Sequence, residues 1–172
     1  MEVKQLLEEH PDYVNTPLCN GSTNGICRAS FLGYKNIVNL LLKYGADINL
    51  RSSNGRSPLI WAAFREHLDL IDLLLDSGAD TSIRDQDGLD AFEVAVIQVN
   101  YKAARMLYKK ANMITPLEER KEKFVDPAGT VVGQYYRGRF DVELFFEYLE
   151  ADVEEVDRDV LYEKIRREKE EW

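Results

Sequence analysis

The sequence repeats itself with a period of 33 residues, and this periodicity limits the possible folds more than any other feature. The triplet Gly-Ala-Asp at 45–47 returns at 78–80, and the turn signal Asn-Gly at 54–55 returns as Asp-Gly at 87–88. A fixed period in this range is typical of solenoids and other repeat proteins. We therefore expect a stack of similar units, each of which buries its apolar face against its neighbours.

An apolar pattern of helical spacing repeats between these turn signals. The matching positions are Ile37, Leu40, Leu41 and Leu42 in one unit and Leu70, Leu73, Leu74 and Leu75 in the next. A small residue also recurs at one phase, as Ala29, Ala62 and Ala95. This spacing predicts helices with one buried stripe each, and the small residues indicate that the helices pack closely against their copies.

The stretch 54–86 resembles an ankyrin repeat. Ser-Pro-Leu at 57–59 stands in place of the family's Thr-Pro-Leu, and Ile60 stands where the family usually has His. The second helix, expected at 68–77, closes with the family's Gly-Ala-Asp, in which Gly suits the left-handed position after a helix end. The resemblance implies an all-α solenoid of helical hairpins.

The resemblance covers residues 1–112, and its units differ in completeness. They are a half repeat at 1–20 and repeats at 21–53, 54–86 and 87–112. The half repeat aligns with the following unit at a shift of 34, which places Asn15 opposite Asn49. The last unit lacks the closing Gly-Ala-Asp, which is expected of a terminal cap.

The period is lost after residue 112, where an acidic C-terminal extension begins. Residues 113–172 contain 10 basic and 17 acidic side chains, against 12 and 14 in residues 1–112. We predict a short helix at 116–125, an extended segment at 130–136 and an amphipathic helix at 141–170. Phe145 and Phe146 belong to the apolar seam of that last helix, which docks either on the repeats or on a partner. The sequence leaves both alternatives open.

Composition and charge narrow the classes of function. The formal net charge of −9 argues against a nucleic-acid partner or an anionic membrane surface, because Lys and Arg supply most of such affinity. No run approaches the roughly 20 apolar residues of a membrane helix, and the start lacks the profile of a signal peptide. We therefore expect a cytoplasmic, intracellular protein, with the cytoskeleton or cilium as more specific alternatives.

Catalytic and metal-binding patterns are not supported by the sequence. The two cysteines, Cys19 and Cys27, and the two histidines, His10 and His67, show no ligand spacing and no triad arrangement. His67 occupies the position of a structural His in the second helix of the resembled family. We therefore expect no enzyme activity, no metal, no cofactor and no small-molecule substrate.

The resemblance implies that partners bind at the hairpin tips and on the concave face of the first helices. By phase, the concave columns are Arg28, Trp61 and Val94; Phe31, Phe64 and Ile97; and Leu32, Arg65 and Gln98. The predicted partner-binding residues are Arg28, Phe31, Trp61, Phe64, Arg65, Ile97, Arg51, Arg56, Arg84, Phe145 and Phe146. Aromatic and Arg side chains are the usual anchors of protein interfaces.

These features together favour a non-catalytic protein-interaction module, an adaptor or scaffold that works as part of a larger complex. Two alternatives remain open at this stage. One is a structural subunit of a large assembly, such as a cytoskeletal or ciliary complex. The other is an acidic inhibitor that masks a basic site on its partner.

Overall fold

The computed structural model describes residues 3–18, 21–98 and 100–110. All of them lie in the first of the two units, Met1–Asn112 and Met113–Trp172, into which the chain divides. The segments expected at 116–125, 130–136 and 141–170 therefore lie outside the described residues.

The described residues form helical hairpins. The elements are α1 (Val3–Glu9), a 3-10 helix η1 (Pro11–Asn15), α2 (Gly25–Leu32), α3 (Lys35–Lys43), α4 (Pro58–Phe64), α5 (Leu68–Asp76), α6 (Ala91–Ile97) and α7 (Tyr101–Lys110). Extended pairing within the described ranges is limited to an isolated bridge between Pro17 and Asn24. The all-helical solenoid expected for the repeats is confirmed, and α5 ends one residue before the predicted boundary.

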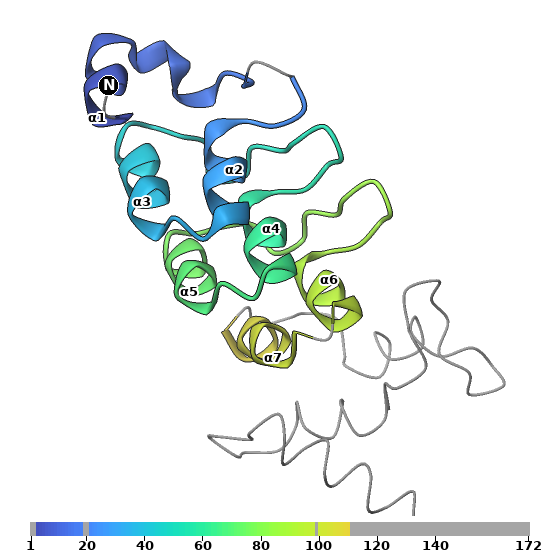
Figure 1. Cartoon of the computed structure of the whole chain (residues 1–172). Coiled ribbons are helices and arrows are strands. Elements are labelled where there is room, and N and C mark those ends of the chain that lie inside the picture. The colour runs from blue at the N-terminus through green and yellow to red at the C-terminus, as the bar shows by residue number, and fades with distance from the viewer. Residues whose placement is uncertain (1–2, 19–20, 99, 111–172) are drawn as a thin grey trace, which may run out of the picture. The chain divides into compact units, whose positions relative to one another are not determined.

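The helices form two layers (Figure 1). The first helices of the units, α2, α4 and α6, lie side by side in one row, and the second helices, α3, α5 and α7, form another. The loops that precede α2, α4 and α6 project to the same side (Figure 1). Within the described part of the chain, no helix is long and apolar enough to cross a membrane.

Each first helix begins at a side-chain cap, and the caps recur every 33 residues. Asn24 Oδ1 accepts a hydrogen bond from the Cys27 amide at 3.0 Å. Ser57 and Asp90 cap α4 and α6 in the same way, on amides three residues further along. Such caps satisfy backbone donors that the first turn of a helix leaves unpaired, so each unit starts its hairpin at a defined residue.

The ends of α2 and α4 are each bound by a side chain at the start of the second helix in the next unit. A ring nitrogen of His67, Nε2, lies 3.1 Å from the Phe31 carbonyl oxygen. One period later, Asn100 Nδ2 donates to the carbonyls of Ala63 and Phe64 at 2.9 and 3.0 Å. The structural role expected for His67 is therefore seen, and Asn100 repeats it.

A second series of repeated hydrogen bonds also joins successive units. Asn15 Oδ1 accepts from the Asp47 amide at 2.8 Å, and Asn49 Oδ1 accepts from the Asp80 amide at 2.9 Å. Asn15 and Asn49 thus play the same part, as their alignment at a shift of 34 predicts. The half repeat is joined to the stack by the same contact that joins the complete units.

The core lies between the two layers. The largest fully buried apolar side chains are Ile26, Leu59, Ile60, Leu70, Ile71, Leu74, Phe92 and Leu107. Ala62, Ala95 and Ala29 are also buried, which agrees with their expected place at close helix contacts. Each apolar stripe packs against the stripes of the adjacent units. The side of the first helices that faces away from these contacts remains exposed to solvent.

Candidate functional site

Three aromatic side chains lie together on the exposed side of α2 and α4. The Phe31 ring of α2 meets the Trp61 ring of α4 edge-on at 5.2 Å between centroids, and it stacks on the Phe64 ring at 6.4 Å. Trp61 and Phe64 are edge-on to each other at 5.8 Å. All three side chains remain partly exposed. The rings come from neighbouring units, so the period itself brings them together.

Three guanidinium groups cover these rings. Those of Arg28 and Arg65 lie over the Phe31 ring, 5.8 and 5.0 Å from its centroid. That of Arg56 lies over both α4 rings, 4.9 Å from each centroid. Such contacts are favourable because the ring face is electron-rich. We call these six residues the aromatic–arginine cluster: Arg28, Phe31, Arg56, Trp61, Phe64 and Arg65.

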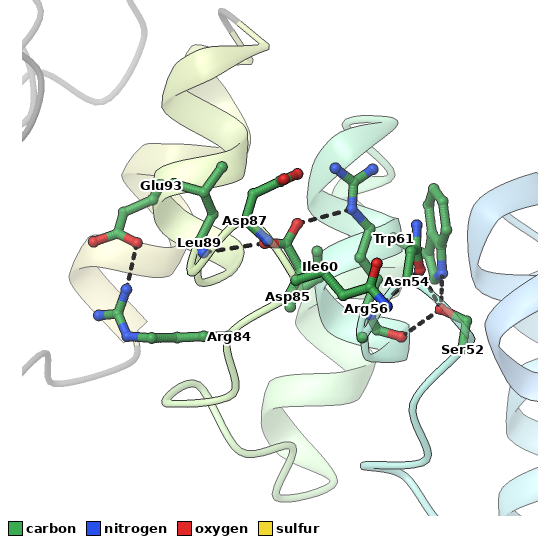
Figure 2. A network of polar contacts seen from close by, with 12 residues as sticks. Ser52, Asn54, Arg56, Ile60, Trp61, Arg84, Asp85, Asp87, Leu89 and Glu93 are labelled. Atoms are coloured by element: carbon green, nitrogen blue, oxygen red, sulfur yellow. Dashed lines mark hydrogen bonds and ion pairs between the residues drawn. The ribbon is translucent and has the colours of Figure 1, made fainter. Parts of the chain in front are cut away.

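Arg56 is fixed from the other side by a carboxylate of the next unit (Figure 2). Its Nε donates to Asp85 Oδ2 at 3.0 Å, and the Asp85 side chain is only 1% exposed. The other oxygen of Asp85 accepts from the amides of Asp87 and Leu89 at 3.0 and 3.1 Å. Asp85 is therefore satisfied at both oxygens, and it ties the cluster to the hairpin tip before α6.

Trp61 is held by its indole nitrogen. Nε1 donates to the Ser52 hydroxyl at 3.1 Å, and that hydroxyl lies 2.7 Å from Asn54 Oδ1 (Figure 2). The Ser52 side chain belongs to the hairpin tip before α4. The indole therefore keeps one orientation, which lowers the entropy lost when a ligand packs against it.

A groove of about 730 Å³ lies beside the rings. Its lining residues are Leu18, Ser22, Thr23, Cys27, Arg28, Phe31, Ser53, Asn54 and Trp61. They come from the hairpin tips and from α2 and α4, which are the elements that the sequence nominated for partner binding. The groove shares Arg28, Phe31 and Trp61 with the aromatic–arginine cluster.

The remaining arginines predicted at the hairpin tips are engaged within the chain. Arg51 donates from Nε to the Gly55 carbonyl at 2.9 Å and from Nη2 to the Arg84 carbonyl at 2.6 Å. Arg84 donates to the Gly88 carbonyl and to Glu93 Oε2, at 2.6 and 2.7 Å. Both side chains thus join successive tips and helices, a role that the sequence did not suggest.

The predicted concave columns differ in the last unit, where Val94 and Ile97 follow the aromatic residues of α4. Ile97 is half-buried on α6, whereas Val94 is only 2% exposed, so the expectation that Val94 lines an open face is wrong. A short aliphatic side chain does not reach past its neighbours as Arg28 and Trp61 do at the same phase. Phe145 and Phe146 lie outside the described residues.

A buried acidic cap at the start of α6 was missed by sequence reasoning. Asp90 Oδ1 accepts from the Glu93 amide at 2.9 Å, and Glu93 Oε2 accepts from the Asp90 amide at 3.0 Å. Both carboxylates are 1% exposed, and both pair with Arg84. The Asp-x-x-Glu spacing is the signature of a reciprocal cap and was the available signal.

Cys27 is one of the residues that line the groove, and its thiol is buried. Its Sγ donates to the Leu50 carbonyl at 3.1 Å, and burial raises its pKa from 9.0 to about 12. A thiol that stays protonated at neutral pH is a poor nucleophile and a poor metal ligand. Within the described ranges, no group of three His, Cys, Asp or Glu residues is arranged to hold a metal ion.

Comparison with known families agrees with this geometry. The family model described as ankyrin repeats (3 copies) matches residues 26–116, which is more than half of the chain. The chain belongs to the ankyrin-repeat family. Ankyrin repeats are generally protein–protein interaction modules. No curated protein matches the chain.

Proposed function

We propose that this ankyrin-repeat chain is a non-catalytic adaptor or scaffold that binds a protein partner through the aromatic–arginine cluster. The observation that carries the proposal is the set of three partly exposed rings, ordered by Arg56 and Ser52 and bordered by a groove. Trp, Tyr and Arg in such settings are the most frequent hot spots of interfaces, because they bury much area at low entropic cost.

The cluster is held in place before any partner arrives. Trp61 donates to Ser52, and Arg56 is bound to the buried carboxylate of Asp85. Ordered anchors lose less conformational freedom on association than mobile ones do, so more of the contact energy contributes to affinity. Ile97 extends the surface toward α6, and the exposed hairpin tips border it. The contribution of Phe145 and Phe146 stays a prediction.

The proposal is tested by cross-linking and affinity capture of proteins with the full chain and with its Phe64→Glu variant. We expect the captured partner to be lost, because a carboxylate replaces the ring that contacts both Phe31 and Trp61. Helical content by circular dichroism should stay nearly unchanged, since the Phe64 side chain is partly exposed.

The matched control is Tyr34→Glu, which places the same charge on an aromatic position that does not belong to the cluster. Tyr34 is 56% exposed at the turn between α2 and α3. Capture by this variant should equal that of the wild type. If Phe64→Glu retains the partner, or if both variants lose it equally, the cluster is not the binding surface.

A further inference from the structure

We infer that the aromatic–arginine cluster recognises an acidic peptide segment, in which two carboxylates flank an apolar side chain. This inference rests on the proposed function and adds the chemistry of the partner. One carboxylate would pair with Arg28 and one with Arg65, while the apolar side chain enters the groove beside Phe31 and Trp61.

The positive charge of this surface is local and only partly neutralised. Residues 1–112 carry a net charge of −2, yet α2 and α4 contain no acidic residue. Arg56 has the carboxylate of Asp85, but among the described residues no carboxylate forms an ion pair with Arg28 or Arg65. Two exposed guanidiniums without a counterion in this part of the chain favour an anionic ligand.

Stacking on the Phe31 ring prepares both guanidiniums for carboxylates. A guanidinium that lies over a ring still presents the N–H donors of its edge, and these donors fit a carboxylate in pairs. The two groups lie 5.8 and 5.0 Å from one centroid, so their central carbons are at most about 11 Å apart. In an extended segment, at about 3.3 Å per residue, acidic residues four positions apart span about 13 Å, and the residue midway between them lies on the same face.

The groove supplies the apolar part of the recognition. Leu18 and the side chains of Phe31 and Trp61 line it, and Leu18 is 40% exposed. An apolar residue between the two carboxylates would cover this surface when the carboxylates reach their arginines. The combination selects an acidic segment that also contains an apolar anchor, because charge alone leaves the groove unfilled.

The same cluster is poorly suited to single-stranded nucleic acid, the other polyanion that arginines and aromatic rings bind. Bases stack on open ring faces. Here the rings already carry guanidiniums at 4.9 to 5.8 Å. Trp61 meets both Phe rings edge-on, and the two Phe rings stack on each other. The geometry therefore favours side-chain carboxylates over bases.

The test is a selection of random-sequence peptides displayed on phage against the full chain. We expect the selected peptides to be enriched in paired Asp or Glu residues around a large apolar residue. Their affinity is then measured by the fluorescence of Trp61 in a Trp172→Phe background, which leaves Trp61 as the single Trp of the chain.

Two double variants with equal charge change separate the cluster from general electrostatics. Arg28→Gln with Arg65→Gln should weaken a selected peptide by about a hundredfold, tenfold for each charged hydrogen-bonding partner removed. Lys35→Gln with Lys43→Gln removes two positive charges from exposed positions of α3 and should leave the affinity within about twofold. Urea unfolding verifies that both variants are folded.

The outcomes distinguish this inference from the proposed function. If the selected peptides are neutral or basic and do not bind the Phe64→Glu variant, the acidic partner is wrong but the proposed binding surface is supported. Selected peptides that bind Phe64→Glu as tightly as the wild type would overturn both the acidic partner and the proposed binding surface. A uridine oligonucleotide that binds the wild type and not the Arg28→Gln, Arg65→Gln variant would also overturn the acidic peptide, in favour of nucleic acid.

Discussion

Repeats 54–86 and 87–112 share one backbone plan but present different chemistry at equivalent positions. Trp61 and Phe64 of the first stand where Val94 and Ile97 stand in the second. The aromatic pair is partly exposed and covered by arginine, whereas Val94 is buried. The proposed recognition surface is therefore concentrated on α2 and α4, and α6 contributes mainly its buried cap.

The same contrast appears inside the stack, at the third residue of each first helix. Cys27, Ile60 and Glu93 are related by the period, and all three are buried. Cys27 forms a hydrogen bond through its thiol and Ile60 has no polar side-chain atom, whereas Glu93 pairs with Arg84 and with its own cap. The last repeat thus buries a charged network at a position where the earlier repeats bury a thiol and an aliphatic side chain.

The largest effect should come from removing the carboxylate at the boundary between these two repeats. Asp85→Ala strips Arg56 of its partner and leaves the amides of Asp87 and Leu89 unpaired. We expect a loss of about 3 kcal/mol in the free energy of unfolding, measured in urea, because breaking a buried ion pair is costly. Asp87→Ala, at an exposed position, should cost less than about 0.5 kcal/mol. Equal effects would contradict the assignment.

A somewhat smaller effect is expected inside the cap of the last repeat. Glu93→Ala removes the acceptor for the Asp90 amide and the partner of Arg84, which should cost about 2 kcal/mol. Glu93→Gln should cost about half as much, because its amide oxygen still accepts from the backbone. Peptide binding at the cluster should survive both changes. A loss of peptide binding on either change would erase the contrast between the two repeats.

The turn that closes α5 tests the backbone of the earlier repeat alone. Gly78 has a φ of +83°, and nothing lies within 4 Å of a Cβ built there. Gly78→Val should therefore cost about 1 kcal/mol or more through backbone strain and not through a clash. An unchanged denaturation midpoint would contradict the left-handed backbone conformation of Gly78 at the end of α5. Ser77→Val at the adjacent exposed position, where φ is −87°, serves as the control.

The smallest effect concerns the pH dependence that Cys27 introduces. Since its pKa is about 12 in the folded chain and 9.0 normally, its contribution is complete below pH 9 and is lost as the pH rises toward 12. The stability difference between wild type and Cys27→Ala should fall by somewhat less than about 1 kcal/mol from pH 8 to pH 9.5. A difference that stays constant would show that the thiol ionises normally in the fold.

Much of the fold could be predicted from the sequence because the period fixes both the helices and their phase. Phase alone places Phe31 and Phe64 on neighbouring helices of one face, and the structure puts their rings 6.4 Å apart. A shift of 34, one residue longer than the period, identifies Asn15 as the counterpart of Asn49. These relations depend only on spacing along a regular helix stack.

Other parts of the site depend on loop conformation, which phase does not describe. Arg56 was expected at a hairpin tip, but the tip folds back through the bond from the Ser52 amide to the Arg56 carbonyl, at 3.0 Å. Its guanidinium therefore reaches the α4 rings. Likewise, Arg51 and Arg84 find carbonyl partners that only the folded tips create. The exposure of Val94 depends on neighbouring side-chain lengths and was mispredicted for that reason.

The contact between successive tips has a consequence for how such a chain can grow. Arg51 donates to the Arg84 carbonyl, and Arg84 stands one period later with the same link to its own glycine carbonyl. The link from an arginine to the glycine carbonyl four residues further along is therefore repeated at both tips that border repeat 54–86. A copy of this repeat inserted after residue 86 would keep that glycine link, but it would place Ile60 where Glu93 now pairs with Arg84. A longer array would therefore require a new partner for the arginine at that boundary.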